Sequence, residues 1–305
     1  MNKILTMVFV FSLFTVSLNC CANIHARKNE NNAQSADLQT VVAKDIDWFK
    51  DNSLKLKKFN VDVVRVYYKG IDVARAGLSG MTITDKYIIF AQITKNENNT
   101  ILNIVDKDTY ELLGTIENHC FRHANDMTFN NKTKEVLIVV GPKKIAKFKI
   151  NDEGEYFLLT NLEYIDCPRT YSGIAYDDNR NQYMAYCSGK MYVLNDQFKE
   201  LFNFPLRRGL IPQGMAYHNN LIYYSCYETG KPNTKYKVYN SKEKGSNVIY
   251  VYDLKGNLKR TLYIPNTFVS GEIENLDFLE NGKLLIGYNI VINGKKTVTF
   301  YQGNM

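Results

Sequence analysis

Polar side chains recur at four equivalent points of the sequence, each just before a run of strand-forming residues. The set combines carboxylates, amides, one imidazole and one phenol, and two arginines lie close to it along the chain. The candidate ligand-binding residues are Arg122, His123, Asn125, Asp126, Arg169, Tyr171, Ser172, Gln213, Glu272, Glu274 and Asn275. Such a mixture is typical of a ligand-binding channel rather than of a dry core.

Two kinds of chemistry suit these groups. Carboxylate and amide oxygens are the ligands that Ca²⁺ prefers, and Asp126 with Glu274 would be the acidic pair of a site for Ca²⁺ or another divalent metal. Alternatively, His123 could act as a general base, since the pKa of histidine lies near neutrality. A third interpretation is purely structural, because Asp or Asn before a strand often only completes a turn.

The candidates lie within an internal repeat. Residues 120–139 align without a gap to residues 167–186, an offset of 47 residues that pairs Cys120 with Cys167 and Arg122 with Arg169. A repeat of this length, built from short strands and polar turns, is typical of a β-propeller blade. We therefore predict that the polar residues ahead of each inner strand face a shared central channel.

The same pattern predicts an all-β propeller of five blades over residues 59–305, or six blades if part of 37–78 forms another. The five inner strands begin Ser79-Gly-Met-Thr-Ile, Asn125-Asp-Met-Thr-Phe, Ser172-Gly-Ile-Ala-Tyr, Gln213-Gly-Met-Ala-Tyr and Glu274-Asn-Leu-Asp-Phe. Blade five lacks one strand, and we expect residues 61–68 to supply it. Pairing of the N- and C-terminal strands would then close the ring and remove free sheet edges.

Three of the five inner strands carry Gly at their second position, where crowding at the axis favours a residue without Cβ. Asp126 and Asn275 replace Gly in the other two strands. Because a functional site breaks the symmetry of a repeat, we expect these two positions, with His123 beside them, to be informative.

The repeated unit x-Gly-[Met/Ile]-Ala-Tyr at Gly173 and Gly214 resembles exported propellers of the gluconolactonase-like and NHL-type groups. The resemblance covers residues 61–302 and is one of fold. Gluconolactonase-like enzymes hold a divalent metal with Glu, Asn and Asp residues around the channel, and Glu274, Asn125 and Asp126 supply these residue types here. The resemblance thus implies a metal-dependent lactonase-type hydrolase as the alternative to a protein that binds a glycan or peptide.

Other catalytic classes find no matching pattern in the sequence. It has no Gly-x-Ser-x-Gly elbow, phosphate-binding loop, His-Glu-x-x-His motif or dinucleotide fingerprint. The formal net charge of +7 is spread along the chain without a dense basic run, so we expect no nucleic-acid partner. We expect a monomer.

The N-terminus resembles an export signal. Residues 2–3 are polar and basic, residues 4–18 are apolar but too short to span a bilayer comfortably, and small residues follow near Ala22. We expect residues 1–22 to be removed and the protein to be secreted, periplasmic or held at the cell surface, without a transmembrane segment. Lipid attachment at Cys20 or Cys21 is the alternative.

The segments flanking the repeats differ in composition from them. Residues 23–36 predict a polar tether, and helix-like spacing predicts a short helix within 37–58. Between two strands of blade four, residues 228–246 form a lysine-rich insertion that suggests either a solvated loop or a rim for an anionic, glycan or surface-protein partner. Cys120, Cys167, Cys187 and Cys226 permit three disulfide pairings, and the sequence selects none.

Overall fold

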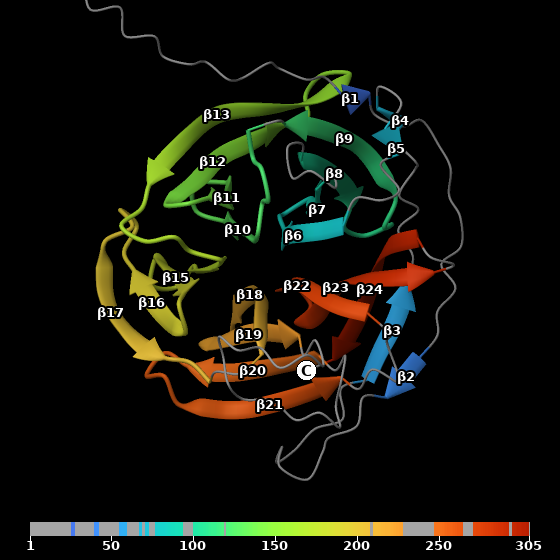
Figure 1. Cartoon of the computed structure of the whole chain (residues 1–305). Coiled ribbons are helices and arrows are strands. Elements are labelled where there is room, and N and C mark those ends of the chain that lie inside the picture. The colour runs from blue at the N-terminus through green and yellow to red at the C-terminus, as the bar shows by residue number, and fades with distance from the viewer. Residues whose placement is uncertain are drawn as a thin grey trace, which may run out of the picture.

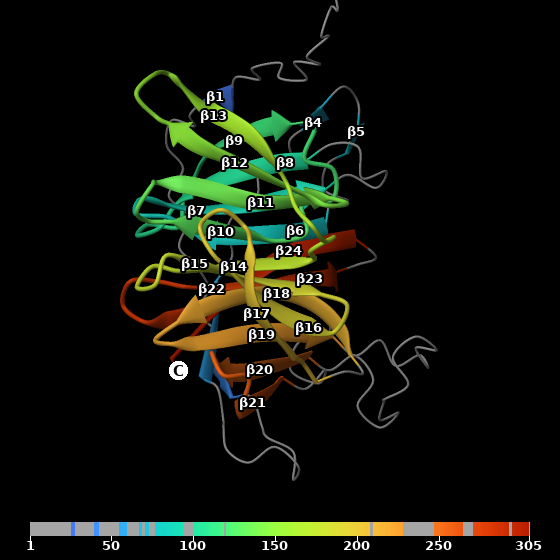
Figure 2. The ribbon, with the colours of Figure 1, turned by 90° about the vertical axis from the view of Figure 1, so that its left-hand side faces the viewer.

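The computed structural model describes 26–27, 40–42, 55–59, 67–68, 71–72, 77–93, 100–118, 120–207, 210–227, 247–264, 271–292 and 295–304. In these residues the chain is all-β, and five antiparallel sheets surround a common axis (Figures 1 and 2). The five-bladed propeller predicted from the repeats is confirmed. The predicted export signal and the insertion 228–246 lie outside the described residues.

Blades one to three follow one another along the chain, and in each the first strand is nearest the axis (Figure 1). Blade one contains β6 (Gly77–Ile83), β7 (Tyr87–Ile93), β8 (Thr100–Asp106) and β9 (Leu112–Asn118). Blade two contains β10 (Met127–Asn130), β11 (Glu135–Gly141), β12 (Lys144–Asn151) and β13 (Tyr156–Asp166), with β1 (Ala26–Arg27) at its outer edge. Blade three contains β14 (Gly173–Asp177), β15 (Gln182–Cys187), β16 (Lys190–Leu194) and β17 (Glu200–Pro205).

The last two blades bring the ends of the chain together. Blade four contains β18 (Ile211–His218), β19 (Leu221–Tyr227), β20 (Asn247–Asp253) and β21 (Leu258–Ile264). Blade five contains β22 (Gly271–Phe278), β23 (Lys283–Ile292), β24 (Lys295–Asn304), β3 (Lys55–Phe59) and β2 (Thr40–Val42). Closure by N- and C-terminal strands is therefore confirmed.

The strand that closes the ring is β3 rather than the predicted segment 61–68. β3 pairs antiparallel with β24, and its Leu56 is completely buried in the core between blades four and five. Of the predicted segment, β4 (Tyr67–Tyr68) pairs instead with β5 (Ile71–Asp72). Of residues 37–58, where the sequence predicts a short helix, only 40–42 and 55–58 are described, and they belong to the paired strands β2 and β3; the rest of that range lies outside the described residues.

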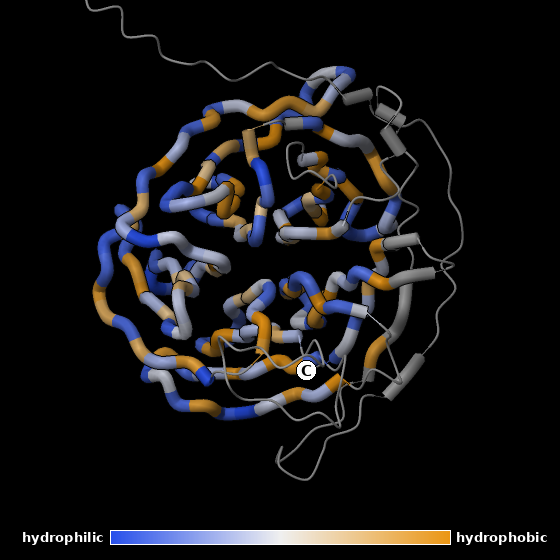
Figure 3. The backbone as a smooth tube through the Cα atoms, viewed as in Figure 1, coloured by the Kyte–Doolittle hydropathy of each residue, from blue (hydrophilic) through white to orange (hydrophobic). Residues whose placement is uncertain are grey.

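The core consists of five hydrophobic clusters, one between each pair of neighbouring blades. Successive side chains of a strand point to opposite faces of its sheet, so both faces of a blade must be apolar. In β7, Ile88 and Phe90 pack against blade five while Ile89 and Ala91 pack against blade two. The second strand of each blade is therefore a nearly continuous apolar run, and hydrophobic residues occur in every blade of Figure 3.

Short polar turns connect the first two strands of each blade. After β10 the Asn130 side chain accepts hydrogen bonds from the backbone N–H groups of Lys132 (3.0 Å) and Thr133 (3.1 Å). Asp177 does the same for Asn179 (3.0 Å) and Arg180 (3.2 Å) after β14. These side chains replace backbone acceptors in the turn, which explains why both copies of the repeat carry Asn or Asp here.

Candidate functional site

Asp126 and Asn275 occupy the axis of the propeller, and both are completely buried. One carboxylate oxygen of Asp126 accepts hydrogen bonds from the Met127 N–H (2.9 Å) and from Asn275 Nδ2 (2.5 Å). The other oxygen accepts from the N–H groups of Ile174 (2.9 Å) and Met215 (3.2 Å). This axial cluster links blades two, three, four and five through a single carboxylate.

The glycines of the neighbouring inner strands make room for the axial cluster. A Cβ on Gly173 would lie 3.2 Å from Asp126 Oδ2, and one on Gly214 would lie 2.5 Å from Asn275 Nδ2. Gly80 is restricted differently, because its Cβ would lie 2.7 Å from the carbonyl oxygen of Ala124. The crowding expected from the sequence is therefore present, and the two polar exceptions fill the space that the glycines leave.

The axial cluster surrounds the Asp126 carboxylate with hydrogen-bond donors, which is not the arrangement of a metal site. Burial raises the pKa of the Asp126 carboxyl well above its ordinary value, while its four hydrogen bonds lower it. Because N–H donors approach both carboxylate oxygens, a cation would have to displace them. Among the described residues, no three His, Cys, Asp or Glu side chains are grouped as metal ligands. The arrangement of Asp126, Glu274 and Asn125 does not fit a calcium ion.

Several predicted residues lie on the start face, where the inner strands begin, and they form hydrogen bonds with one another or with neighbouring residues. Gln213 donates a hydrogen bond to Glu272 (2.6 Å), and Asn289 donates one to Glu274. The backbone N–H of Asn125 donates to Val139 (3.0 Å), and that of Ser172 donates to Tyr186 (2.9 Å). The carbonyl of His123 accepts a hydrogen bond from the Ser79 hydroxyl. These contacts brace the strand starts of the five blades.

The remaining predicted residues make contacts of other kinds. Arg169 pairs with Glu200 (3.1 Å), and its guanidinium lies 4.5 Å from the ring centroid of Tyr192. Tyr171 is buried in the core between blades two and three, where its hydroxyl has no hydrogen-bond partner among the described residues and burial raises its pKa. Arg122 is exposed, and its carbonyl accepts a hydrogen bond from Thr100 (2.5 Å).

Among the described residues, Cys167, Cys187 and Cys226 are free thiols. Cys167 and Cys226 are buried, and burial raises the pKa of the Cys167 thiol to about 11. A thiol with a raised pKa is a weak nucleophile at neutral pH because its thiolate fraction is small. Cys167 and Cys226 therefore serve as small core side chains.

A pocket opens on the opposite side of the propeller, the end face, where the inner strands end. The cavity measures about 350 Å³, and all five blades line it. Its walls include the fifth residue of each inner-strand repeat, counted from the first residues aligned in the sequence. These five residues are Ile83, Phe129, Tyr176, Tyr217 and Phe278. Four of the five are aromatic, and we call the five residues together the aromatic ring. We call the cavity the end-face pocket.

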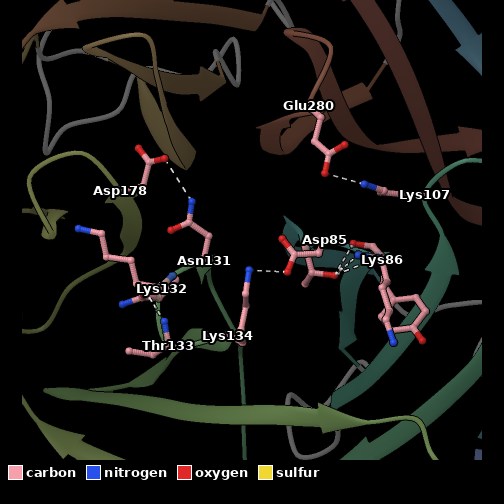
Figure 4. Close-up of polar contacts among 12 residues, drawn as sticks. Asp85, Lys86, Lys107, Asn131, Lys132, Thr133, Lys134, Asp178 and Glu280 are labelled. Carbon is pink, nitrogen blue, oxygen red and sulfur yellow. Dashed lines mark hydrogen bonds and ion pairs between the residues drawn. The ribbon is translucent and has the colours of Figure 1, made fainter.

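The rim of the end-face pocket is polar, and it also repeats. Two residues beyond the aromatic ring, each blade contributes an acid or an amide: Asp85, Asn131, Asp178, Asn219 and Glu280. In Figure 4, Asn131 points toward Asp178 (3.2 Å), Lys134 pairs with Asp85 (2.6 Å) and Lys107 pairs with Glu280 (2.7 Å). These contacts link neighbouring blades at three places around the rim.

Two titratable groups stand deeper in the end-face pocket. Asp277 accepts hydrogen bonds from the Thr82 hydroxyl (3.0 Å) and from the N–H groups of Ile83 (2.8 Å) and Phe278 (2.8 Å). Burial raises the pKa of its carboxyl to about 6, against the opposite effect of these donors. The His218 ring stacks on Phe278 at a centroid distance of 4.3 Å, and burial lowers its pKa.

No site residue predicted from the sequence lines the end-face pocket. The signal was nevertheless present in the alignment of the inner strands. Its fifth column is aromatic in four of five blades, and its seventh column is acidic or amide in all five. The predicted site residues all come from the starts of the inner strands, although the central channel of a propeller opens at both ends.

No protein-family model matches the chain, and no curated protein sequence matches it. Solved structures do match. Glutaminyl cyclase from Myxococcus xanthus aligns with a TM-score of 0.51 at 7% identity, covering 76% of this chain and 93% of that one. Hydrazine synthase from Kuenenia stuttgartiensis (TM-score 0.40, 10% identity, 75% and 60% covered) and the WD40 repeats of RRP9 (TM-score 0.40, 12% identity, 70% and 74% covered) are more distant.

At these identities the likeness is one of fold. The Myxococcus xanthus protein is named as an enzyme, so a propeller with enzymatic activity is among the structures that this chain resembles in fold. In the described residues, no helix has the length and apolar character needed to cross a membrane. The chain is a five-bladed β-propeller.

Proposed function

We propose that this protein binds a small polar ligand of the glycan or peptide class in the end-face pocket. The observation that carries the proposal is the lining: one cavity of about 350 Å³ to which every blade contributes a ring residue and a polar rim residue. Small-molecule sites typically combine an apolar or aromatic wall with a few convergent polar groups, in volumes of about 300–1,000 Å³. The sequence placed such a site on the start face, and we place it on the end face.

The lining offers both kinds of contact that sugars and peptides need. Aromatic faces such as those of Phe129 and Tyr176 can stack against the apolar side of a sugar ring or an amino-acid side chain. Amides and carboxylates of the rim can accept and donate the hydrogen bonds that fix the orientation of such a ligand. The predicted export signal would place the protein where extracellular glycans and peptides occur.

Isothermal titration calorimetry with a panel of neutral and amino oligosaccharides and short peptides tests this proposal. We expect Asp178→Ala and Phe129→Ala to raise Kd by roughly fivefold or more, as expected for loss of a polar contact or a ring contact of about 1 kcal/mol. Gln213→Ala, on the start face, is the control and should bind as the wild type does. Equal loss in Gln213→Ala and none in the pocket variants would refute the placement.

A metal-dependent lactonase-type hydrolase, as implied by the gluconolactonase-like resemblance, is the weaker hypothesis. It needs the Asp126 carboxylate as a ligand, and four N–H donors already bind that group. We predict that neither EDTA nor millimolar Ca²⁺ shifts the Tm. A ligand in excess over its Kd stabilises the state that binds it, so a clear rise in Tm with Ca²⁺, reversed by EDTA, would restore the metal hypothesis.

A further inference from the structure

The end-face pocket is acidic in a chain whose formal net charge is +7. Among the described residues, four carboxylates line it, those of Asp85, Asp178, Asp277 and Glu280, and no lysine or arginine does. The one imidazole in the lining, His218, has a pKa lowered by burial and is therefore neutral at pH 7. The pocket thus has a sign opposite to that of the molecule as a whole.

Neighbouring lysines balance only part of this charge. Lys134 pairs with Asp85, and Lys107 pairs with Glu280. Within the described residues, Asp178 accepts its hydrogen bond from the amide of Asn131, and Asp277 accepts from a hydroxyl and two backbone N–H groups. Among the described residues, Asp178 and Asp277 therefore have neutral hydrogen-bond partners and no ion pair with a lysine or arginine.

The aromatic side chains of the aromatic ring can also bind a cation. The face of an aromatic side chain attracts an ammonium group through its quadrupole, and the attraction strengthens when the ammonium group is desolvated. One member of the ring already shows this preference, because Lys134 Nζ lies 5.8 Å from the centroid of Phe129. Tyr176, Tyr217 and Phe278 present further rings to the same cavity.

Resting on the proposed function, we propose that the ligand of the end-face pocket carries a protonated amine whose charge is balanced by the carboxylates of Asp178 and Asp277. The body of such a ligand lies against the aromatic ring. Amino sugars and peptides with a free amino group share this chemistry. The experiment separates these two sources and separates both from neutral ligands.

Calorimetric titrations at pH 7.5 use two matched pairs of probes. The first pair is the β-1,4-linked trisaccharide of glucosamine and its fully N-acetylated counterpart, which differ in charge but share a backbone. The second is trialanine amide with a free N-terminus and the same peptide N-acetylated. We expect the cationic member of one pair to bind at least tenfold more tightly than its neutral partner, and that pair identifies the source.

Variants locate the charge that confers this preference. Asp178 is exposed and Asn is nearly isosteric with it, so the Asp178→Asn variant should fold normally. It should reduce the preference for the cationic probe over its neutral partner at least fivefold. Asp277→Asn should reduce it as well. Asp166→Asn removes the same charge from an exposed position outside the pocket lining and is the control that should bind like the wild type.

The outcomes distinguish the inference from the proposal on which it rests. Equal binding of charged and neutral probes, with Kd values that rise in Phe129→Ala, would overturn the amine inference and leave the end-face pocket as a neutral-ligand site. Binding of no probe, with no effect of any pocket variant, would overturn both. Undiminished cationic preference in Asp178→Asn and Asp277→Asn would overturn the assignment to these carboxylates.

Discussion

The Asp126 side chain joins four blades of the propeller, although no other blade has Asp at the equivalent position. Its carboxylate accepts three backbone N–H groups and the amide of Asn275 at the axis. The sequence identified Asp126 and Asn275 as breaks in the symmetry, which was correct, and interpreted them as ligand-binding residues. A sequence alignment cannot tell a group that fills the axis from one that faces solvent, because both replace Gly.

We predict that Asp126→Ala lowers the free energy of unfolding by about 3 kcal/mol or more, because several buried donors lose their acceptor. Urea denaturation followed by tyrosine fluorescence or circular dichroism measures the change. Asp166→Ala, an exposed surface substitution, should cost about 0.5 kcal/mol or less. A similar small cost for both substitutions would show that the axial cluster does not hold the blades together.

Asp277 should make stability depend on pH. Its pKa in the folded state, about 6, lies above the ordinary value of a carboxyl group, so the folded protein binds this proton more tightly than the unfolded chain does. The stabilisation is complete below about pH 4 and is lost as pH rises through 6. Urea denaturation from pH 4 to 8 should show the stability of the wild type falling relative to Asp277→Asn across this range.

The opposite trend, a gain in the relative stability of the wild type between pH 4 and 6, would contradict this assignment.

The affinity for the ligand should change with pH in the reverse sense. An amine binds best when Asp277 is ionised and His218 is neutral, so the affinity for the cationic probe should increase from pH 5 to 7. The titration of Asp277, which was not among the residues predicted from the sequence, therefore reports on the end-face pocket.

At the scale of elements, the repeats predicted the blades well, and the unique segments were predicted poorly. Inner strands recur five times, so each copy supports the others. The closing strand occurs once and must be chosen by composition alone. Residues 61–68 are richer in β-branched and aromatic side chains, whereas β3 reads Lys-Leu-Lys-Lys-Phe and was not predicted as a strand. Its pairing with β24 depends on a partner distant in sequence, which local patterns do not reveal.

Leucine substitutions test the closing strand directly. Leu56 is completely buried between blades four and five, and Leu201 is 48% exposed on β17. We predict that Leu56→Ala costs about 2–5 kcal/mol of the free energy of unfolding, as for other buried leucines. Leu201→Ala should cost about 0.5 kcal/mol or less. A negligible effect of Leu56→Ala on urea denaturation would mean that β3 does not close the ring.

At the scale of the whole molecule, a propeller offers two mouths with different lining. On the start face, predicted site residues such as Gln213 and Glu272 bind each other. On the end face, the inner strands terminate in an aromatic ring and a polar rim around a cavity. The sequence predicted the architecture correctly, but the choice between the two faces depends on which side chains form hydrogen bonds with one another.

Amide chemical-shift mapping of the deuterated protein, titrated with the glucosamine trisaccharide and the trialanine amide, tests the central claim most directly. We predict that the largest shifts occur at the end face, in residues 83–85, 128–131, 176–179, 217–219 and 277–280. Shifts concentrated instead at the start face, in residues 122–126, 169–172, 213 and 272–275, would contradict the assignment of the site to the end-face pocket.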